Sequence, residues 1–133
     1  MAQLTNIEME RMLGSLAPLL PQRNMVGYAA ARNTRILQDS LTEYTMMRDS
    51  LVERYGDPVT DEDGNFTGQV SIHPGTEAFS KFSEEIEPFM WILHDVDLYR
   101  IAITEAIGRL SGEEILASEW MFDGEVGPDG ALR

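Results

Sequence analysis

The fold is decided by residues 30–56, AARNTRILQDSLTEYTMMRDSLVERYG. Apolar residues recur there at alternating steps of four and three, the spacing of one face of an α-helix, with a single polar interruption at Arg48. Asn24 can cap the start of this helix, and Gly56 followed by Pro58 is typical of a helix end. The pattern therefore predicts one helix from about residue 25 to residue 55, roughly 45 Å long.

A helix of that length is longer than so small a domain can cover completely. We therefore expect its apolar seam to carry either the packing of the chain or its association with a partner. The candidate seam residues are Leu37, Leu41, Tyr44, Leu51 and Tyr55.

Two capping boxes predict helix starts elsewhere in the chain. Thr5-Asn6-Ile7-Glu8 precedes apolar residues at helical spacing and predicts a helix over about 5–17, ended by Pro18. Ser111-Gly112-Glu113-Glu114 predicts a last helix over about 112–122. Both boxes place a hydroxyl and a carboxylate three residues apart, as reciprocal capping requires.

The middle of the chain is more varied. Asp63-Gly64 is a tight-turn signal between short apolar runs, and it predicts a small β-hairpin, with an ordered loop as the alternative, within residues 57–75. Thr76 can cap a third helix, which Pro88 ends or kinks. Residues 91–103 fit either a helix or a strand, and their polar–apolar alternation favours the strand.

These elements predict a mainly α fold, with α+β as the alternative. A long central helix packs with shorter helices and a small β-hairpin. The length predicts one domain over residues 1–124, followed by a flexible tail over 125–133 that contains several Gly and Pro residues.

The charge of the chain is unevenly distributed. The net charge is −13. Residues 1–56 hold six basic and six acidic side chains, whereas residues 57–133 hold four basic and seventeen acidic ones. Direct binding to nucleic acid or to anionic lipid is disfavoured, because phosphate contacts need Lys and Arg. A basic protein partner is compatible with this charge.

No pattern indicates catalysis or a cofactor. The absence of cysteine excludes thiol chemistry and Cys-based metal sites, and it fits a cytosolic protein. Asp61, Asp63 and Asn65 match the first ligand positions of a calcium loop, but Phe66 and Ile72 occupy positions that need Gly and Glu. No nucleophile or phosphate-loop motif is present. We therefore expect a non-enzyme with no catalytic residue, no metal and no cofactor.

Three segments resemble a known group of proteins. They are Ala31-Arg32-Asn33, the helix end from Arg48 to Gly56, and the terminal run from Ile115 to Met121. Their order is similar to that in a domain-of-unknown-function family of small proteins from phages and prophages of Gram-positive bacteria. The resemblance covers about residues 25–122. It implies a viral origin and an all-helical or α+β fold, and it supplies no activity.

The charge and the resemblance together predict an acidic interaction protein that binds and inhibits a host protein, such as an antiviral defence factor with a basic nucleic-acid-binding groove. The alternative is a virion or tail-assembly accessory protein that associates through its long helix. We expect a soluble protein of the host bacterial cytoplasm, or of the virion, with no membrane contact and with homo-oligomers as a further option. The candidate interaction residues are Glu84, Glu85, Glu87, Glu113, Glu114 and Glu119.

Overall fold

The computed structural model describes residues 2–124. Over this range the chain forms five α-helices, three short 3-10 helices and six strands that pair two by two. The mainly α class with small strand pairs is therefore confirmed. The predicted tail at 125–133 lies outside the described residues. Contacts divide the chain into two compact units, one of residues 41–92 and one that joins residues 2–40 to residues 93–124.

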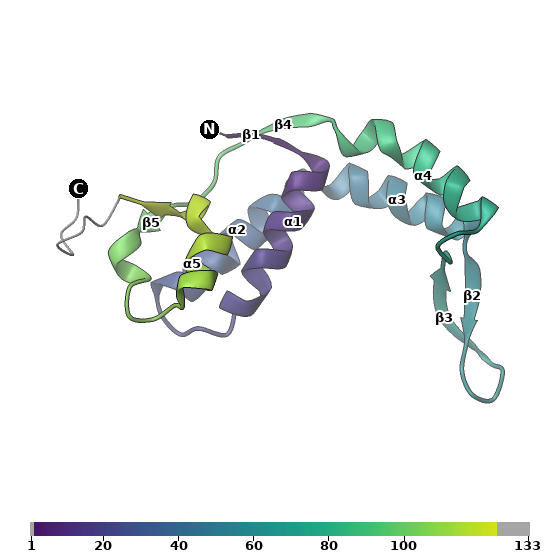
Figure 1. The fold of residues 1–133 in the computed structure, drawn as a ribbon, viewed down its shortest axis with the longest axis horizontal. Helices are drawn as coiled ribbons and strands as arrows, with labels where there is room; N and C mark the ends of the chain where they lie inside the picture. The colour runs from purple at the N-terminus through teal and green to yellow at the C-terminus, as the bar shows by residue number, and fades with distance from the viewer. Residues whose placement is uncertain (1, 125–133) are drawn as a thin grey trace. The chain divides into compact units, whose positions relative to one another are not determined.

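Helices α1 (Asn6–Leu16) and α2 (Met25–Ser40) form the helical layer of the first unit and lie against each other (Figure 1), with the 3-10 helix η1 (Ala17–Leu19) between them in sequence. The helix predicted at 5–17 is thus confirmed. The Thr5 hydroxyl accepts the Glu8 backbone N–H at 3.2 Å and donates to the Glu8 carboxylate at 3.1 Å. The buried apolar side chains of this unit include Met9, Leu16, Leu19, Val26, Leu37, Val96, Ile101, Met121 and Phe122.

Short elements complete this unit. Strand β1 (Ala2–Thr5), which the sequence patterns did not predict, pairs antiparallel with β4 (Leu93–Val96). The remaining elements are β5 (Ile101–Ala102), which is parallel to β6 (Phe122–Asp123), then η2 (Ile103–Glu105), α5 (Gly112–Ala117) and η3 (Glu119–Met121).

The start of α2 requires a glycine. A Cβ atom at Gly27 would collide with the backbone carbonyl of Gln22. Because the obstacle is backbone, a side chain at position 27 would force the preceding turn away from the helix. Gly27 therefore fixes how α2 follows η1.

The second unit contains α3 (Thr42–Tyr55), β2 (Asp57–Thr60), β3 (Phe66–Ser71) and α4 (Glu77–Met90). Helix α3 packs against α4, and the hairpin of β2 and β3 runs away from the two helices as a ribbon (Figure 1). The predicted hairpin is confirmed, and so is the helix capped by Thr76, whose hydroxyl accepts the Phe79 N–H at 3.2 Å. The buried apolar side chains are Leu41, Tyr44, Leu51 and Ile86.

The single helix predicted over residues 25–55 is not confirmed. It is divided at Leu41, where φ is −93° and ψ is 0°, into α2 and α3. The Ser40 hydroxyl donates to the Ile36 carbonyl at 3.0 Å, a side-chain bond of the kind that loosens and bends helices. The apolar residues keep their helical spacing through Leu41, so this spacing could not predict that the helix is divided there.

Two other boundaries differ from expectation. Helix α4 continues through Pro88 to Met90, so Pro88 does not end the helix, which was one of the two effects predicted for it. The last helix, predicted over 112–122, is shorter in the structure. Helix α5 ends at Ala117, and the 3-10 helix η3 follows it. Within 91–103 the structure has strands Leu93–Val96 and Ile101–Ala102, as the alternation favoured.

The capping box at α5 gives a stability prediction. Ser111 accepts the Glu114 N–H at 3.1 Å, and the Glu114 carboxylate accepts the Ser111 N–H at 2.9 Å. We expect Ser111→Ala to lower the free energy of unfolding by about 1 kcal/mol, because it removes one of these bonds. Ser111→Thr keeps the hydroxyl and is the control. Urea unfolding followed by Trp120 fluorescence in a Trp91→Phe background measures both, and equal midpoints for Ser111→Ala and Ser111→Thr would show that the cap adds nothing.

Candidate interaction surfaces

The first acidic cluster, Glu84, Glu85 and Glu87, lies on α4, with all three side chains exposed. Glu85 lies 3.9 Å from the guanidinium of Arg54 on α3, so one of the three carboxylates is partly neutralised. The other two have no such partner among residues 2–124. The cluster is therefore a solvated acidic face.

Glu87 also lines an apolar groove on the same helix. The groove holds about 390 Å³, and its lining residues are Phe82, Ser83, Ile86, Glu87, Met90 and Trp91. The Trp91 side chain is 58% exposed, which is unusual for so large an apolar group. Tryptophan is enriched at protein–protein interfaces, so the exposed Trp91 in this groove makes the groove a candidate protein-contact surface.

The second acidic cluster lies in the other unit. Glu113 and Glu119 are exposed, on α5 and η3. Glu114 is half-buried and caps α5, so its carboxylate is already used locally. The two predicted clusters thus belong to different units, and in the second the carboxylates of Glu113 and Glu119 have no ion-pair partner among residues 2–124.

The predicted seam residues are mostly buried within the single chain. Leu37, Leu41, Tyr44 and Leu51 are buried, and Tyr55 is half-buried. Side chains in such positions support the fold of the chain. The seam residues are therefore core residues, and they do not form an exposed surface that a partner could contact.

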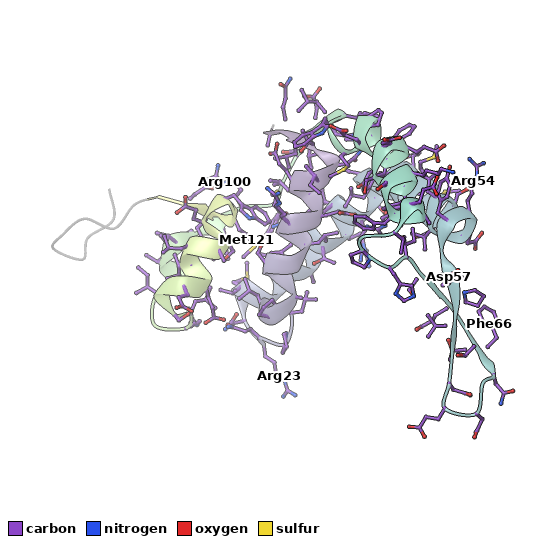
Figure 2. All side chains as sticks on the ribbon, turned by 45° about the vertical axis from the view of Figure 1, so that its right-hand side comes forward. Arg23, Arg54, Asp57, Phe66, Arg100 and Met121 are labelled. Atoms are coloured by element: carbon purple, nitrogen blue, oxygen red, sulfur yellow. The ribbon has the colours of Figure 1, made fainter. Side chains whose placement is uncertain are left out.

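The β2–β3 hairpin is an exposed acidic arm. From residue 57 to residue 71 it has four carboxylates, and no Lys or Arg occurs between Arg54 and Lys81. Phe66 is 60% exposed and lies on the ribbon, away from the helices (Figure 2). The Asp63-Gly64 turn signal predicted the hairpin but not its exposure, because alternation in a short strand does not indicate what covers the strand.

The turn of this arm is held by local bonds. The Asp61 carboxylate accepts the backbone N–H groups of Asp63 and Asn65, both at 2.9 Å. Gly64 has φ +82°, as a tight turn of this type requires. The side chains that suggested a calcium loop thus form a turn, and among residues 2–124 no group of three His, Asp or Glu side chains is arranged to hold a metal.

Helix α2 carries a further cluster, of aromatic, arginine and asparagine side chains, which the sequence patterns did not predict. Asn33 is fully buried, and its side-chain amide holds both backbone groups of Tyr99: it donates to the carbonyl at 2.8 Å and accepts the N–H at 2.7 Å. The guanidinium of Arg32 lies over the Tyr99 ring, with the Arg32 Cζ atom 4.5 Å from the centroid of that ring. The Tyr28 ring meets Tyr99 edge-on at 5.8 Å. An asparagine on the apolar face of a helix is the signal that predicts such a clamp.

Beside this cluster is an open pocket of about 480 Å³ along α2. Its lining residues are Tyr28, Ala31, Arg32, Arg35, Ile36 and Asp39. It combines two guanidinium groups with aromatic and apolar walls, although the chain as a whole is strongly acidic.

The comparisons with known proteins give no match: no family model, no curated protein and no solved structure is significantly similar to this chain. The described helices include none that is both long enough and apolar enough to cross a membrane. The class that the fold and these surfaces define is a mainly helical protein with small strand pairs and several exposed contact surfaces.

Proposed function

We propose that this chain is a non-enzymatic interaction protein that binds a basic protein partner through its acidic unit, residues 41–92. The observation that carries the proposal is the β2–β3 arm, which combines four carboxylates with an exposed Phe66. An isolated two-stranded hairpin is marginally stable in water, and this one buries very little of its surface. A partner that covers the arm would supply the missing burial.

The charges of the whole unit support the same partner. It has eleven acidic and three basic side chains, a net charge of −8. Each of its basic residues, Arg48, Arg54 and Lys81, already lies within 4.0 Å of a carboxylate. The field that remains is negative, and it would speed association with a positively charged groove.

The partner that fits best is a host protein whose groove binds nucleic-acid phosphates, such as an antiviral defence factor. Carboxylates on an exposed arm offer that groove the charge it normally meets on a phosphate backbone. Occupation of the groove would inhibit the host protein in the bacterial cytoplasm. The phage origin expected from the sequence directs this proposal to a host target.

The alternative function is a virion or tail-assembly accessory protein that associates through a helix face, here that of α3, because the long helix predicted from the sequence is divided at Leu41. It is favoured by α3, which leaves Met46 and Met47 exposed. Contact through these apolar side chains depends little on salt, whereas contact through carboxylates depends on it strongly. Salt dependence therefore separates the two functions.

We expect Glu62→Lys with Asp63→Lys to abolish partner binding, because the pair changes the net charge of the arm from −4 to 0 without touching Asp61. The wild-type chain is immobilised and exposed to a host-cell lysate, and bound protein is eluted with salt from about 50 to 300 mM or with duplex DNA. The expected result is a captured protein that both eluents release and that the variant does not retain.

Two controls make the same change in charge elsewhere. Glu84→Lys with Glu87→Lys changes the α4 face and should weaken capture. Glu113→Lys with Glu119→Lys lies in the other unit and should leave capture unchanged. Retention that is insensitive to salt, to DNA and to all three double variants would contradict the proposal and favour the helix contact of the assembly function.

A further inference from the structure

The pocket along α2 carries charge opposite to that of the chain. Arg32 and Arg35 both line it, one helical turn apart. In the same unit Arg100 and Arg109 have carboxylate partners, Asp123 at 2.9 Å and Glu105 at 3.6 Å. Neither pocket arginine forms an ion pair with any of residues 2–124. Two guanidinium groups that line one pocket without ion-pair partners among these residues favour an anion between them.

Arg32 is held in position before any ligand arrives. Its guanidinium is stacked on the Tyr99 ring, and the backbone of Tyr99 is fixed by the buried Asn33 amide. Stacking occupies a flat face of the guanidinium and leaves its N–H edge free for two parallel hydrogen bonds to an oxyanion. Such prior ordering lowers the entropy cost of binding.

We propose that this pocket binds a nucleoside monophosphate. A phosphomonoester carries a charge of roughly −1.5 to −2 near neutral pH, which matches two guanidinium groups better than a single carboxylate does. Tyr28 is 52% exposed, and with Ala31 and Ile36 it offers an apolar wall where a flat ring can lie. The volume of the pocket is within the range of small-molecule sites, roughly 300–1,000 Å³.

The third charged lining residue limits the size of the anion. Asp39 reduces the net charge of the pocket from +2 to +1. Together with the acidic remainder of the chain, this disfavours a triphosphate or a nucleic-acid strand, which would bring additional phosphates into a negative field. A single phosphate with an attached ring is the ligand that the charges and the walls accept together.

This inference concerns residues 2–40 and 93–124 and does not depend on the basic partner proposed for the other unit. The test is titration of the full chain at about 50 mM salt with adenosine monophosphate, inorganic phosphate, adenosine and phosphotyrosine, read by calorimetry and by the NMR signals of Tyr28. We expect adenosine monophosphate to bind more tightly than inorganic phosphate and adenosine, because only it engages both the guanidinium groups and the apolar wall.

Three arginine variants complete the experiment. Arg35→Gln should weaken the binding of adenosine monophosphate at least about tenfold, because a charge-assisted bond is lost. It should leave the fold intact, since the Arg35 side chain is exposed. Arg32→Gln should act in the same direction, while Arg23→Gln, an exposed arginine outside the pocket, is the control and should change nothing (Figure 2).

Absence of binding at about 10 mM ligand, or affinity unchanged in both pocket variants, would overturn the proposal. Tighter binding of phosphotyrosine than of adenosine monophosphate would overturn the nucleotide assignment and identify a phosphorylated side chain as the ligand. Loss of stability in Arg32→Gln without any ligand binding to the wild type would show that the stack on Tyr99 is structural only.

Discussion

Leu41→Asp is expected to unfold residues 41–92, with a loss of more than about 4 kcal/mol in the free energy of unfolding. Leu41 is 3% exposed, at the point where α2 ends and α3 begins. Removal of its buried apolar side chain costs about 2–5 kcal/mol, and burial of an unpaired carboxylate in its place costs several more. The unit has four buried apolar side chains, so it has little reserve to absorb such a loss.

The two tryptophans allow this result to be read for one unit at a time. Trp91 belongs to residues 41–92 and Trp120 to the other unit. In a Trp120→Phe background, urea unfolding followed by Trp91 fluorescence reports on the unit that contains Leu41. Met46→Asp is the matched control, because Met46 is 68% exposed on α3 and its change should cost less than about 0.5 kcal/mol.

The seam assignment would be wrong if Leu41→Asp and the control unfolded at the same urea concentration. Sedimentation velocity on the same samples distinguishes a second outcome. A folded variant with a lower sedimentation coefficient than the wild type would place Leu41 in a contact between copies of the chain, as the assembly function requires.

Local signals in the sequence predicted most element starts correctly. The hydroxyl caps at Thr5, Thr76 and Ser111 accept backbone N–H groups as expected, and Asp63-Gly64 forms the turn of the hairpin. These features are visible in sequence because a cap or a turn is made by residues within four positions of each other. Nothing distant in the chain has to be known.

Features that depend on distant residues were missed. Strand β1 is four residues long and exists because it pairs with β4, about ninety residues away. One local feature was missed as well: the Ser40 hydroxyl bonds to the Ile36 carbonyl where α2 ends, and apolar periodicity does not register such a bond. The interaction surfaces were predicted only in part: charge identified the acidic clusters and the capping box already assigned Glu114 to a cap, but the ion pair of Glu85 with Arg54 on another helix depends on three-dimensional geometry.

Asn33→Asp is expected to destabilise the other unit by about 3–5 kcal/mol. The substitution keeps the shape of the side chain but replaces its N–H₂ donor with an oxygen. That oxygen would face the Tyr99 carbonyl, which the Asn33 amide now contacts at 2.8 Å. Two acceptors would then meet at hydrogen-bond distance, and a carboxylate would lie at a position that is 0% exposed.

The controls for this prediction separate the clamp from the ring above it. Asn33→Ala removes the clamp without adding charge and should cost about 2–4 kcal/mol, because two backbone groups of Tyr99 lose their partners. Tyr99→Phe keeps those backbone bonds and the ring, and it should be close to neutral. Urea unfolding is followed by Trp120 fluorescence in a Trp91→Phe background. If Asn33→Asp and Tyr99→Phe unfold at the same urea concentration, the clamp adds no stability, and Arg32 must be positioned by its stack on Tyr99 alone.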